Sequence, residues 1–136
     1  MDKVLIDPDV ILDFFFDREP FAQFATEIFV LCESKQLIGY TTPVIISNVY
    51  YLLSRTAKHE VIIDKLKQLL SILEIATMNK EVVMAALNSK FKDFEDALQN
   101  CVAQNQGDIP ILLTRNIKDY KKSELAVLSP EMYLKK

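Results

Sequence analysis

The stretch MDKVLIDPDVILDFFFD, residues 1–17, decides the fold. Its apolar residues 4–6 follow one another without polar alternation, which is typical of a strand buried on both faces of a parallel sheet. Pro8 favours an extended backbone at Asp7 and fits the first turn of a helix, so the stretch predicts a strand followed directly by a helix. Asp7 is therefore expected at the carboxyl end of a central strand, where open α/β sheets bind their ligands.

Length and composition are those of a globular protein. The chain has 136 residues, of which 50% are hydrophobic and 26% charged, and it has only two glycines. A chain of this length buries roughly two thirds of its unfolded surface, so a single domain over residues 1–136 is expected. No apolar stretch reaches the roughly twenty residues that cross a membrane, and the chain does not begin with a basic and then apolar leader. We therefore predict a cytoplasmic protein without membrane contact.

Charge and cysteine placement narrow the classes of function. The net charge of −3 excludes a protein held to nucleic acid by bulk electrostatics. Neither Cys32 nor Cys101 has a second cysteine or histidine at metal-ligand spacing, so reduced thiols are expected rather than a disulfide or a zinc site. A local group of cations remains as a candidate for phosphate contact, with scattered surface lysines as the competing interpretation. Its members are Lys90, Lys92, Arg115, Lys118, Lys121 and Lys122.

Helical and strand patterns alternate along the rest of the chain. Further strands are expected at 36–40, 74–76, 109–114 and 126–128. Helices are expected at 9–16, 20–35, 42–56, 61–73, 80–89 and 93–106, with Gly107 as a cap, and from Pro130 onward. Strands joined by helical crossovers predict an α/β fold with a parallel sheet and helices on both of its faces.

Asn48 is the polar exception on the helix expected at 42–56. It shares a face with Val44, Ile45 and Leu52, where an unpaired amide costs a few kcal/mol. The amide therefore needs a partner. A buried structural hydrogen bond and a place facing a polar active-site crevice both satisfy that need.

Acidic and amide side chains gather near the expected strand ends. Asp93 and Asp96 lie three residues apart on one helix face, where Asp93 could also serve only the helix N-terminus. Beyond the strand at 109–114 stand Thr114, Asn116 and Asp119. Right-handed crossovers bring these positions to one edge of the sheet, beside Asp7. Carboxylates so close repel one another unless a cation lies between them, which indicates Mg²⁺ or Mn²⁺ and the activation of water for phosphodiester hydrolysis.

Five segments together resemble the PIN-domain family, which includes the ribonuclease toxins of bacterial toxin–antitoxin pairs. They are LIDPDVILDF at 5–14, TTPVIISNVYYLL at 41–53, KDFEDALQ at 92–99, LLTRNIKDY at 112–120 and VLSPEMYL at 127–134. The resemblance implies a three-layer α/β/α sandwich with a central parallel sheet and an acidic pocket that binds Mg²⁺ or Mn²⁺. It also implies endoribonuclease activity on RNA, a homodimer and, in toxins, an antitoxin protein that blocks the site.

The resemblance also implies roles for individual residues. Asp7 matches the family's first acid, Asp96 the acid on the later helix, and Asp119 an acid after the last core strand. The catalytic residues are expected to be Asp7, Asp96, Asp119, Asn48 and Asn116. The expected metal ligands are Asp7, Asp93, Asp96 and Asp119, with Asp9 as an outer ligand. The expected nucleic-acid contacts are Thr114, Arg115 and Lys118.

Two positions depart from the commonest family pattern. Asn48 stands where many members have glutamate, and Asn116 stands where many have aspartate. Each amide removes a negative charge, which lowers the expected metal affinity. A degenerate PIN domain that binds RNA or a protein partner without cutting is therefore one alternative. Another is a haloacid-dehalogenase-type phosphatase, because residues 7–10, DPDV, resemble the first motif of that family, in which an aspartate is the nucleophile.

Overall fold

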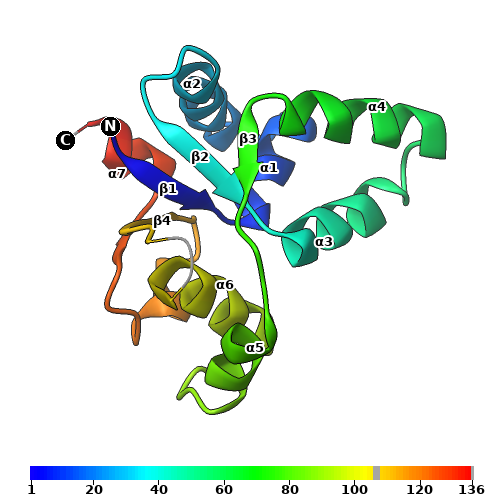
Figure 1. Cartoon of the computed structure of the whole chain (residues 1–136). Coiled ribbons are helices and arrows are strands. Elements are labelled where there is room, and N and C mark those ends of the chain that lie inside the picture. The colour runs from blue at the N-terminus through cyan, green and yellow to red at the C-terminus, as the bar shows by residue number, and fades with distance from the viewer. Residues whose placement is uncertain (106–107, 136) are drawn as a thin grey trace.

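A five-stranded sheet forms the centre of the computed structural model, which describes residues 1–105 and 108–135 (Figure 1). The strands are β1 (Lys3–Ile6), β2 (Ile38–Thr41), β3 (Leu73–Ile75), β4 (Ile111–Leu113) and β5 (Ala126–Leu128). Their order across the sheet is β3-β2-β1-β4-β5, and every neighbouring pair is parallel. The expected central parallel sheet is confirmed.

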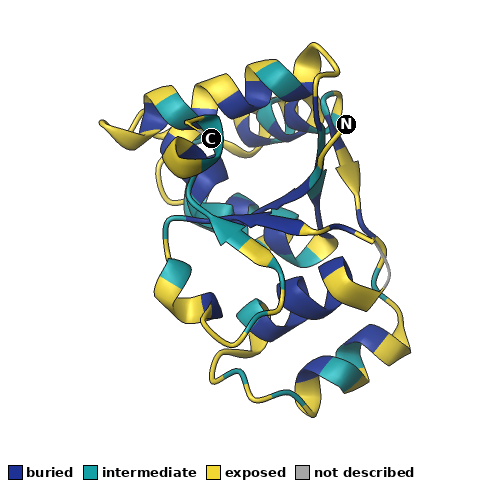
Figure 2. Ribbon diagram, turned by 90° about the vertical axis from the view of Figure 1, so that its left-hand side faces the viewer, coloured by how far each residue is buried: buried dark blue, intermediate teal, exposed yellow. Residues whose placement is uncertain are grey.

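Helices cover both faces of this sheet (Figure 2). They are α1 (Pro8–Phe15), α2 (Phe21–Glu33), α3 (Pro43–Leu53), α4 (His59–Leu70), α5 (Lys80–Leu87), α6 (Phe94–Asn105) and α7 (Pro130–Leu134). On one side α2 packs against α1 and α7, and on the other α5 packs against α6. The three-layer α/β/α sandwich is thereby confirmed. A 3₁₀ helix, η1 (Ile117–Tyr120), was not expected, and the expected cap Gly107 lies outside the described residues.

The first strand is the centre of the core, as its apolar run predicts. Val4, Leu5 and Ile6 are fully buried, because β2 and β4 flank β1 and helices cover both of its faces. Both cysteines are buried free thiols. Within the described residues, no helix is long and apolar enough to cross a membrane.

The direction of the chain reverses across the sheet between β1 and β4. From β1 the chain runs outward through β2 and β3, and it then returns to pair β4 with the other side of β1. Ligand sites of open α/β sheets lie at such a switch point, outside the carboxyl ends of the strands. The backbone N–H of Asp7 donates to the carbonyl of Leu113 at 3.0 Å, which places Asp7 beside Thr114, the next residue after β4.

Two buried side chains join α3 to α6 next to this switch point. The Thr42 hydroxyl accepts a hydrogen bond from the backbone N–H of Ile45 at 3.1 Å and thereby caps the N-terminus of α3. The same hydroxyl donates to the Gln99 side-chain oxygen at 3.1 Å, and both residues are almost fully buried. This bond holds the start of α3 against α6, the helix that carries Asp96.

Candidate active site

Asp7 is a buried carboxylate held by two hydroxyl groups. Its side chain is only 5% exposed; Oδ2 accepts a hydrogen bond from Thr114 at 2.9 Å, and Oδ1 accepts one from Tyr120 at 3.0 Å. Burial, followed by the negative charge of Asp9, raises the pKa of Asp7 to about 8. A carboxyl group buried here without a cation therefore holds its proton at neutral pH. A bound cation would favour the ionised form instead.

Tyr120 links Asp7 to Asp96, although the two acids are far apart in the sequence. Its hydroxyl lies 3.1 Å from Asp96 Oδ1, besides the 3.0 Å to Asp7 Oδ1. Burial and these two acids raise the pKa of Tyr120, so the hydroxyl keeps its proton. Because one hydroxyl has one proton, it donates to only one carboxylate at a time. Burial, followed by Asp93, also raises the pKa of the half-buried Asp96, to about 6.

Removal of the Tyr120 hydroxyl is expected to slow any reaction that depends on Asp7 and Asp96. In Tyr120→Phe both carboxylates lose their shared donor. The RNA cleavage that the family resemblance predicts should then fall roughly 10- to 100-fold, as it does when other groups that orient metal ligands are removed. Cleavage should be measured over a series of Mn²⁺ concentrations. Tyr133→Phe is the matched control, because it also removes a tyrosine–aspartate hydrogen bond, the 2.7 Å bond to Asp2, at another place in the molecule. Equal rates for the two variants would show that Tyr120 has no part in the reaction.

Asp9 presents a carboxylate oxygen that lacks a partner. Its Oδ2 accepts a hydrogen bond from the backbone N–H of Arg115 at 2.9 Å. The same oxygen lies 3.3 Å from the Thr114 hydroxyl, whose single proton has a shorter contact to Asp7. Asp9 Oδ1 is buried and has no hydrogen-bond partner in the part of the chain that the structure describes. Burial raises the pKa of Asp9 as well. A buried oxygen left unsatisfied in this way is a position that a cation or water can fill.

Asn48 finds its partner in Glu95, the residue that precedes Asp96. The Asn48 Nδ2 group donates to Glu95 Oε2 at 2.8 Å. The expectation that this amide needs a partner is thus confirmed. The interpretation as a buried structural hydrogen bond is wrong, because the bond is exposed and Asn48 is only half-buried. Glu95 lines the cleft described next, whereas Asn48 does not line it. Reasoning from the sequence did not single out Glu95, because an acid in the first turn of a helix usually serves only the helix N-terminus.

Seven polar side chains line one cleft of about 330 Å³, here called the acid cleft. They comprise four acids, one arginine and two amides: Asp7, Asp9, Arg18, Glu95, Asp96, Gln99 and Asn116. A larger hollow of about 730 Å³ lies at the opposite edge of the sheet, where Lys3 begins β1 and Pro110 precedes β4. We place the chemistry in the smaller cleft, because it alone of the two contains the buried carboxylates with shifted pKa values.

The remaining predicted site residues lie around this cleft. Asp93, Lys118 and Asp119 line a second cleft, of about 300 Å³, which shares Asp96 with the acid cleft. Asp93 also caps α6, because its Oδ1 accepts the backbone N–H of Asp96 at 3.0 Å, the modest role left open for it. Thr114 is fully buried beneath Asp7, where its hydroxyl also accepts the backbone N–H of Asn116 at 3.0 Å.

Arg115 is bound to a buried partner that the sequence did not reveal. Its Nε donates to Asp13 Oδ2 at 2.6 Å and its Nη2 to Asp13 Oδ1 at 2.9 Å, and the guanidinium lies 4.0 Å from the centroid of the Phe21 ring. Asp13 is 1% exposed. This geometry gives Arg115 a structural task, while its contact with RNA stays a prediction.

The acid cleft fits a hydrated divalent cation better than a fully caged one. Among the described residues, no three or more histidine, cysteine, aspartate or glutamate side chains form a group that could hold a metal ion. Mg²⁺, however, keeps several waters and usually binds through one or two carboxylates. Asp7 and Asp96 share a single donor, and Asp9 has an unsatisfied oxygen, so hard oxygen ligands for such an ion are present.

The sequence of this chain is similar to those of one known protein family. Residues 3–118 match the model of the PIN domain family. Ribonuclease VapC1 of Aquifex aeolicus (strain VF5) is 30% identical over 137 residues, which cover 97% of this chain and 93% of that protein. These matches extend over all the elements that carry the acid cleft.

Solved structures give the same result for the fold. VapBC2 from Rickettsia felis, bound to a DNA fragment from its promoter, has a TM-score of 0.70 at 17% identity, over 93% of this chain and 97% of that one. VapBC-1 from nontypeable Haemophilus influenzae has a TM-score of 0.69 at 12% identity, over 95% and 98% of the two chains. The family match over most of the sequence confirms the resemblance: this chain belongs to the PIN domain family.

Proposed function

We propose that this PIN-domain protein is a metal-dependent endoribonuclease, the toxin of a toxin–antitoxin pair. The observation that carries the proposal is the junction of Asp7 and Asp96 through one buried tyrosine at the switch point of the sheet. The name of the relative Ribonuclease VapC1 supports the activity, and the VapBC structures support an antitoxin as partner. The proposal includes an RNA substrate, a homodimer and a cytoplasmic location.

Residues in and around the acid cleft have distinct tasks in this reaction. Asp7 and Asp96 would hold Mg²⁺ or Mn²⁺, which when bound supplies charge neutralisation and an activated water. Thr114 and Tyr120 fix the two oxygens of Asp7. Glu95, held by Asn48, contributes the carboxylate that α3 lacks, and it can accept a proton from the attacking water. Asn116 and the outer acids Asp93 and Asp119 complete the polar surroundings.

Cleavage of a mixed RNA pool by the purified protein tests the proposal. Fragments should accumulate in Mn²⁺ and should not form in EDTA. A folded protein, free of any antitoxin, that cuts no RNA at any Mn²⁺ concentration would overturn the nuclease proposal.

A PIN domain that binds without cutting is the second candidate, and the amides Asn48 and Asn116 favour it. Both stand where many family members have acids, so the cleft has fewer negative charges for a metal. Asn116→Asp discriminates between the two candidates, because a weakened metal site should gain activity and a pure binder should gain none. The family match gives the phosphatase interpretation of the DPDV segment no support.

Glu95→Gln is expected to lower RNA cleavage about 100-fold if Glu95 acts as proton acceptor. Asn48→Leu should lower it less, since it frees the glutamate without removing it. Asn48→Glu should also lower cleavage, because it places a second carboxylate against Glu95, and adding Glu95→Gln to it should restore part of the rate. Rates should be measured at saturating RNA.

Glu81→Gln is the matched control for Glu95→Gln. Glu81 is an exposed glutamate in the first turn of α5, so its substitution makes the same change of charge at the same place in a helix. A rate as low as that of Glu95→Gln in this control would contradict a specific role for Glu95.

A further inference from the structure

The second cleft gathers positive charge beside the acid cleft. Four lysines line it together with three aspartates and an aromatic ring, and we call it the lysine cleft. Its members are Phe91, Lys92, Asp93, Asp96, Lys118, Asp119, Lys121 and Lys122. All four lysines are exposed, and they outnumber the aspartates in a chain whose net charge is −3. The positive charge here is therefore local.

Three of these ammonium groups have no fixed partner. Lys92, Lys118 and Lys121 form no salt bridge and no side-chain hydrogen bond within residues 1–105 and 108–135, although Asp93 and Asp119 line the same cleft. Lys122 differs, because its ammonium donates to the carbonyl of Lys90 at 3.0 Å. Three unpaired cations around one hollow can neutralise the charges of an anionic ligand.

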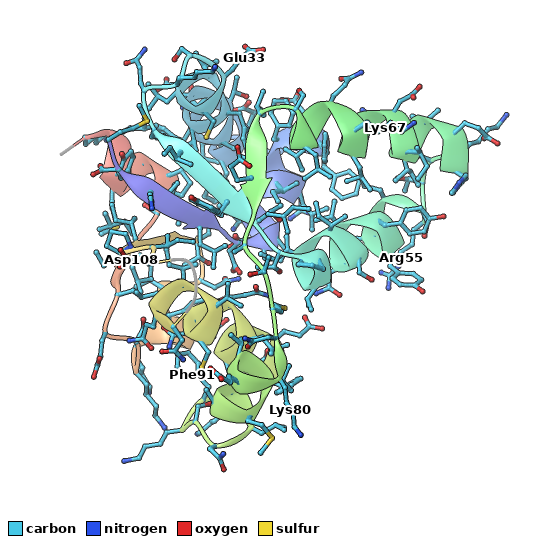
Figure 3. All side chains as sticks on the ribbon, viewed as in Figure 1. Glu33, Arg55, Lys67, Lys80, Phe91 and Asp108 are labelled. Carbon is cyan, nitrogen blue, oxygen red and sulfur yellow. The ribbon has the colours of Figure 1, made fainter. Side chains whose placement is uncertain are left out.

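The two clefts adjoin each other, because Asp96 lines both. A strand whose scissile phosphate lay at Asp7 and Asp96 would have to continue past Asp96 in at least one direction. Phe91 lies in the lysine cleft with its ring packed against Tyr120, at 5.9 Å between centroids, and Figure 3 shows it beside α6. Cations that follow a backbone and an aromatic face next to them are the parts from which single-strand sites are built.

We propose that the lysine cleft binds the backbone of single-stranded RNA on one side of the scissile bond. Lys92, Lys118 and Lys121 contact successive phosphates, and the inference rests on the proposed nuclease function. Lysine suits this task as a compact point charge on a flexible stem. Such contacts position the strand without reading its sequence. They also offset, at this place, the repulsion between RNA and a chain whose net charge is negative.

The salt dependence of RNA binding tests this proposal without requiring cleavage. The probe is a fluorescein-labelled oligouridine, and the protein carries Asp7→Asn and is kept in EDTA. The test variant is Lys92→Gln/Lys118→Gln/Lys121→Gln. The matched control is Lys35→Gln/Lys58→Gln/Lys67→Gln, which has the same net charge but changes exposed lysines outside the lysine cleft; Figure 3 labels Lys67 on α4, away from Phe91.

Three phosphate contacts on a single strand contribute about 2 to the slope of log affinity against log salt concentration. The slope of the test variant should be smaller by that amount. Between about 50 and 200 mM salt, the RNA affinity of the control variant should therefore fall by a factor roughly twenty times larger than that of the test variant. Folding of both variants is checked by urea unfolding. Equal slopes in the two variants, or no RNA binding by the parent protein at low salt, would overturn the proposal.

Two further results distinguish RNA binding by the lysine cleft from binding of an acidic protein segment and from the nuclease function. If the test variant keeps the RNA slope but loses binding of polyglutamate, the lysine cleft recognises an acidic protein segment and the RNA proposal is wrong. The nuclease function is judged apart, from fragments made by the unmodified protein in Mn²⁺. Active cleavage with equal slopes would reject only the lysine cleft, and a lost slope without cleavage would support the lysine cleft while rejecting the nuclease.

Discussion

Asp7→Asn is expected to reduce RNA cleavage by about 10³-fold and, at the same time, to make the metal-free protein more stable. The loss follows because Asp7 is the most buried acid of the acid cleft and the one that joins both hydroxyl donors. The gain follows because burial opposes the negative charge of Asp7. A neutral amide of the same shape avoids this cost, so the free energy of unfolding should rise by about 1–2 kcal/mol.

The raised pKa of Asp7 also predicts how the free energy of unfolding changes with pH. Asp7 titrates near pH 8 in the folded protein, against an ordinary value of 3.8, so the folded state binds more protons over that range. Stability from this group is fully present below about pH 4 and is lost as the pH rises through about 8. Urea unfolding in EDTA should show this loss in the parent protein and a smaller one in Asp7→Asn. Identical pH dependence in the two proteins would contradict the raised pKa.

The expected loss of RNA cleavage in Asp7→Asn needs its own control, because the substitution would not change the activity of a contaminating nuclease. Asp108→Asn serves this purpose, since Asp108 is an exposed aspartate at the opposite edge of the sheet. It should cut RNA as fast as the parent protein. If Asp7→Asn cuts equally fast, the activity does not belong to the acid cleft.

Local rules explain which parts of the fold the sequence could predict. An unbroken apolar run followed by Asp7-Pro8 allows few conformations, and the structure has the strand and helix where they were expected. The strand expected at 36–40 begins only at Ile38. The cause is Lys35, whose positive φ of 62° ends α2 in a tight turn, with the backbone N–H of Gln36 bonded to the carbonyl of Leu31.

Pairings across the molecule explain what the sequence could not predict in the site. The cost of a buried amide predicted that Asn48 needs a partner, but the identity of Glu95 depends on how α3 packs on α6. Tyr120 reads as an ordinary core aromatic, and only the meeting of β1, α6 and η1 gives its hydroxyl two carboxylates. Asp13 likewise looks like a polar position on a surface helix until Arg115 is found beside it.

Arg115→Ala is expected to lower the free energy of unfolding by about 3 kcal/mol. The substitution leaves the carboxylate of Asp13, a residue only 1% exposed, without its two charged hydrogen bonds. Arg18 cannot replace them, because its Nη1 lies 3.6 Å from Asp13 Oδ1. Arg115→Lys should recover only part of the loss, because an ammonium cannot reproduce the bidentate geometry. Urea unfolding measures the effect, with Arg55→Ala as the control for loss of an exposed arginine.

Removal of both partners separates the structural task of Arg115 from its predicted contact with RNA. In Asp13→Leu/Arg115→Met no buried charge is left unpaired, so the free energy of unfolding should return to within about 1 kcal/mol of the parent value. If this stable double variant binds and cuts RNA normally, Arg115 serves only the fold, and any defect of Arg115→Ala reflects unfolding. If the double variant is stable but binds RNA more weakly, with a smaller salt slope, Arg115 contacts a phosphate as well. Failure of the double substitution to restore stability would instead show that the bidentate pair, and not merely the relief of an unpaired charge, stabilises this edge of the sheet.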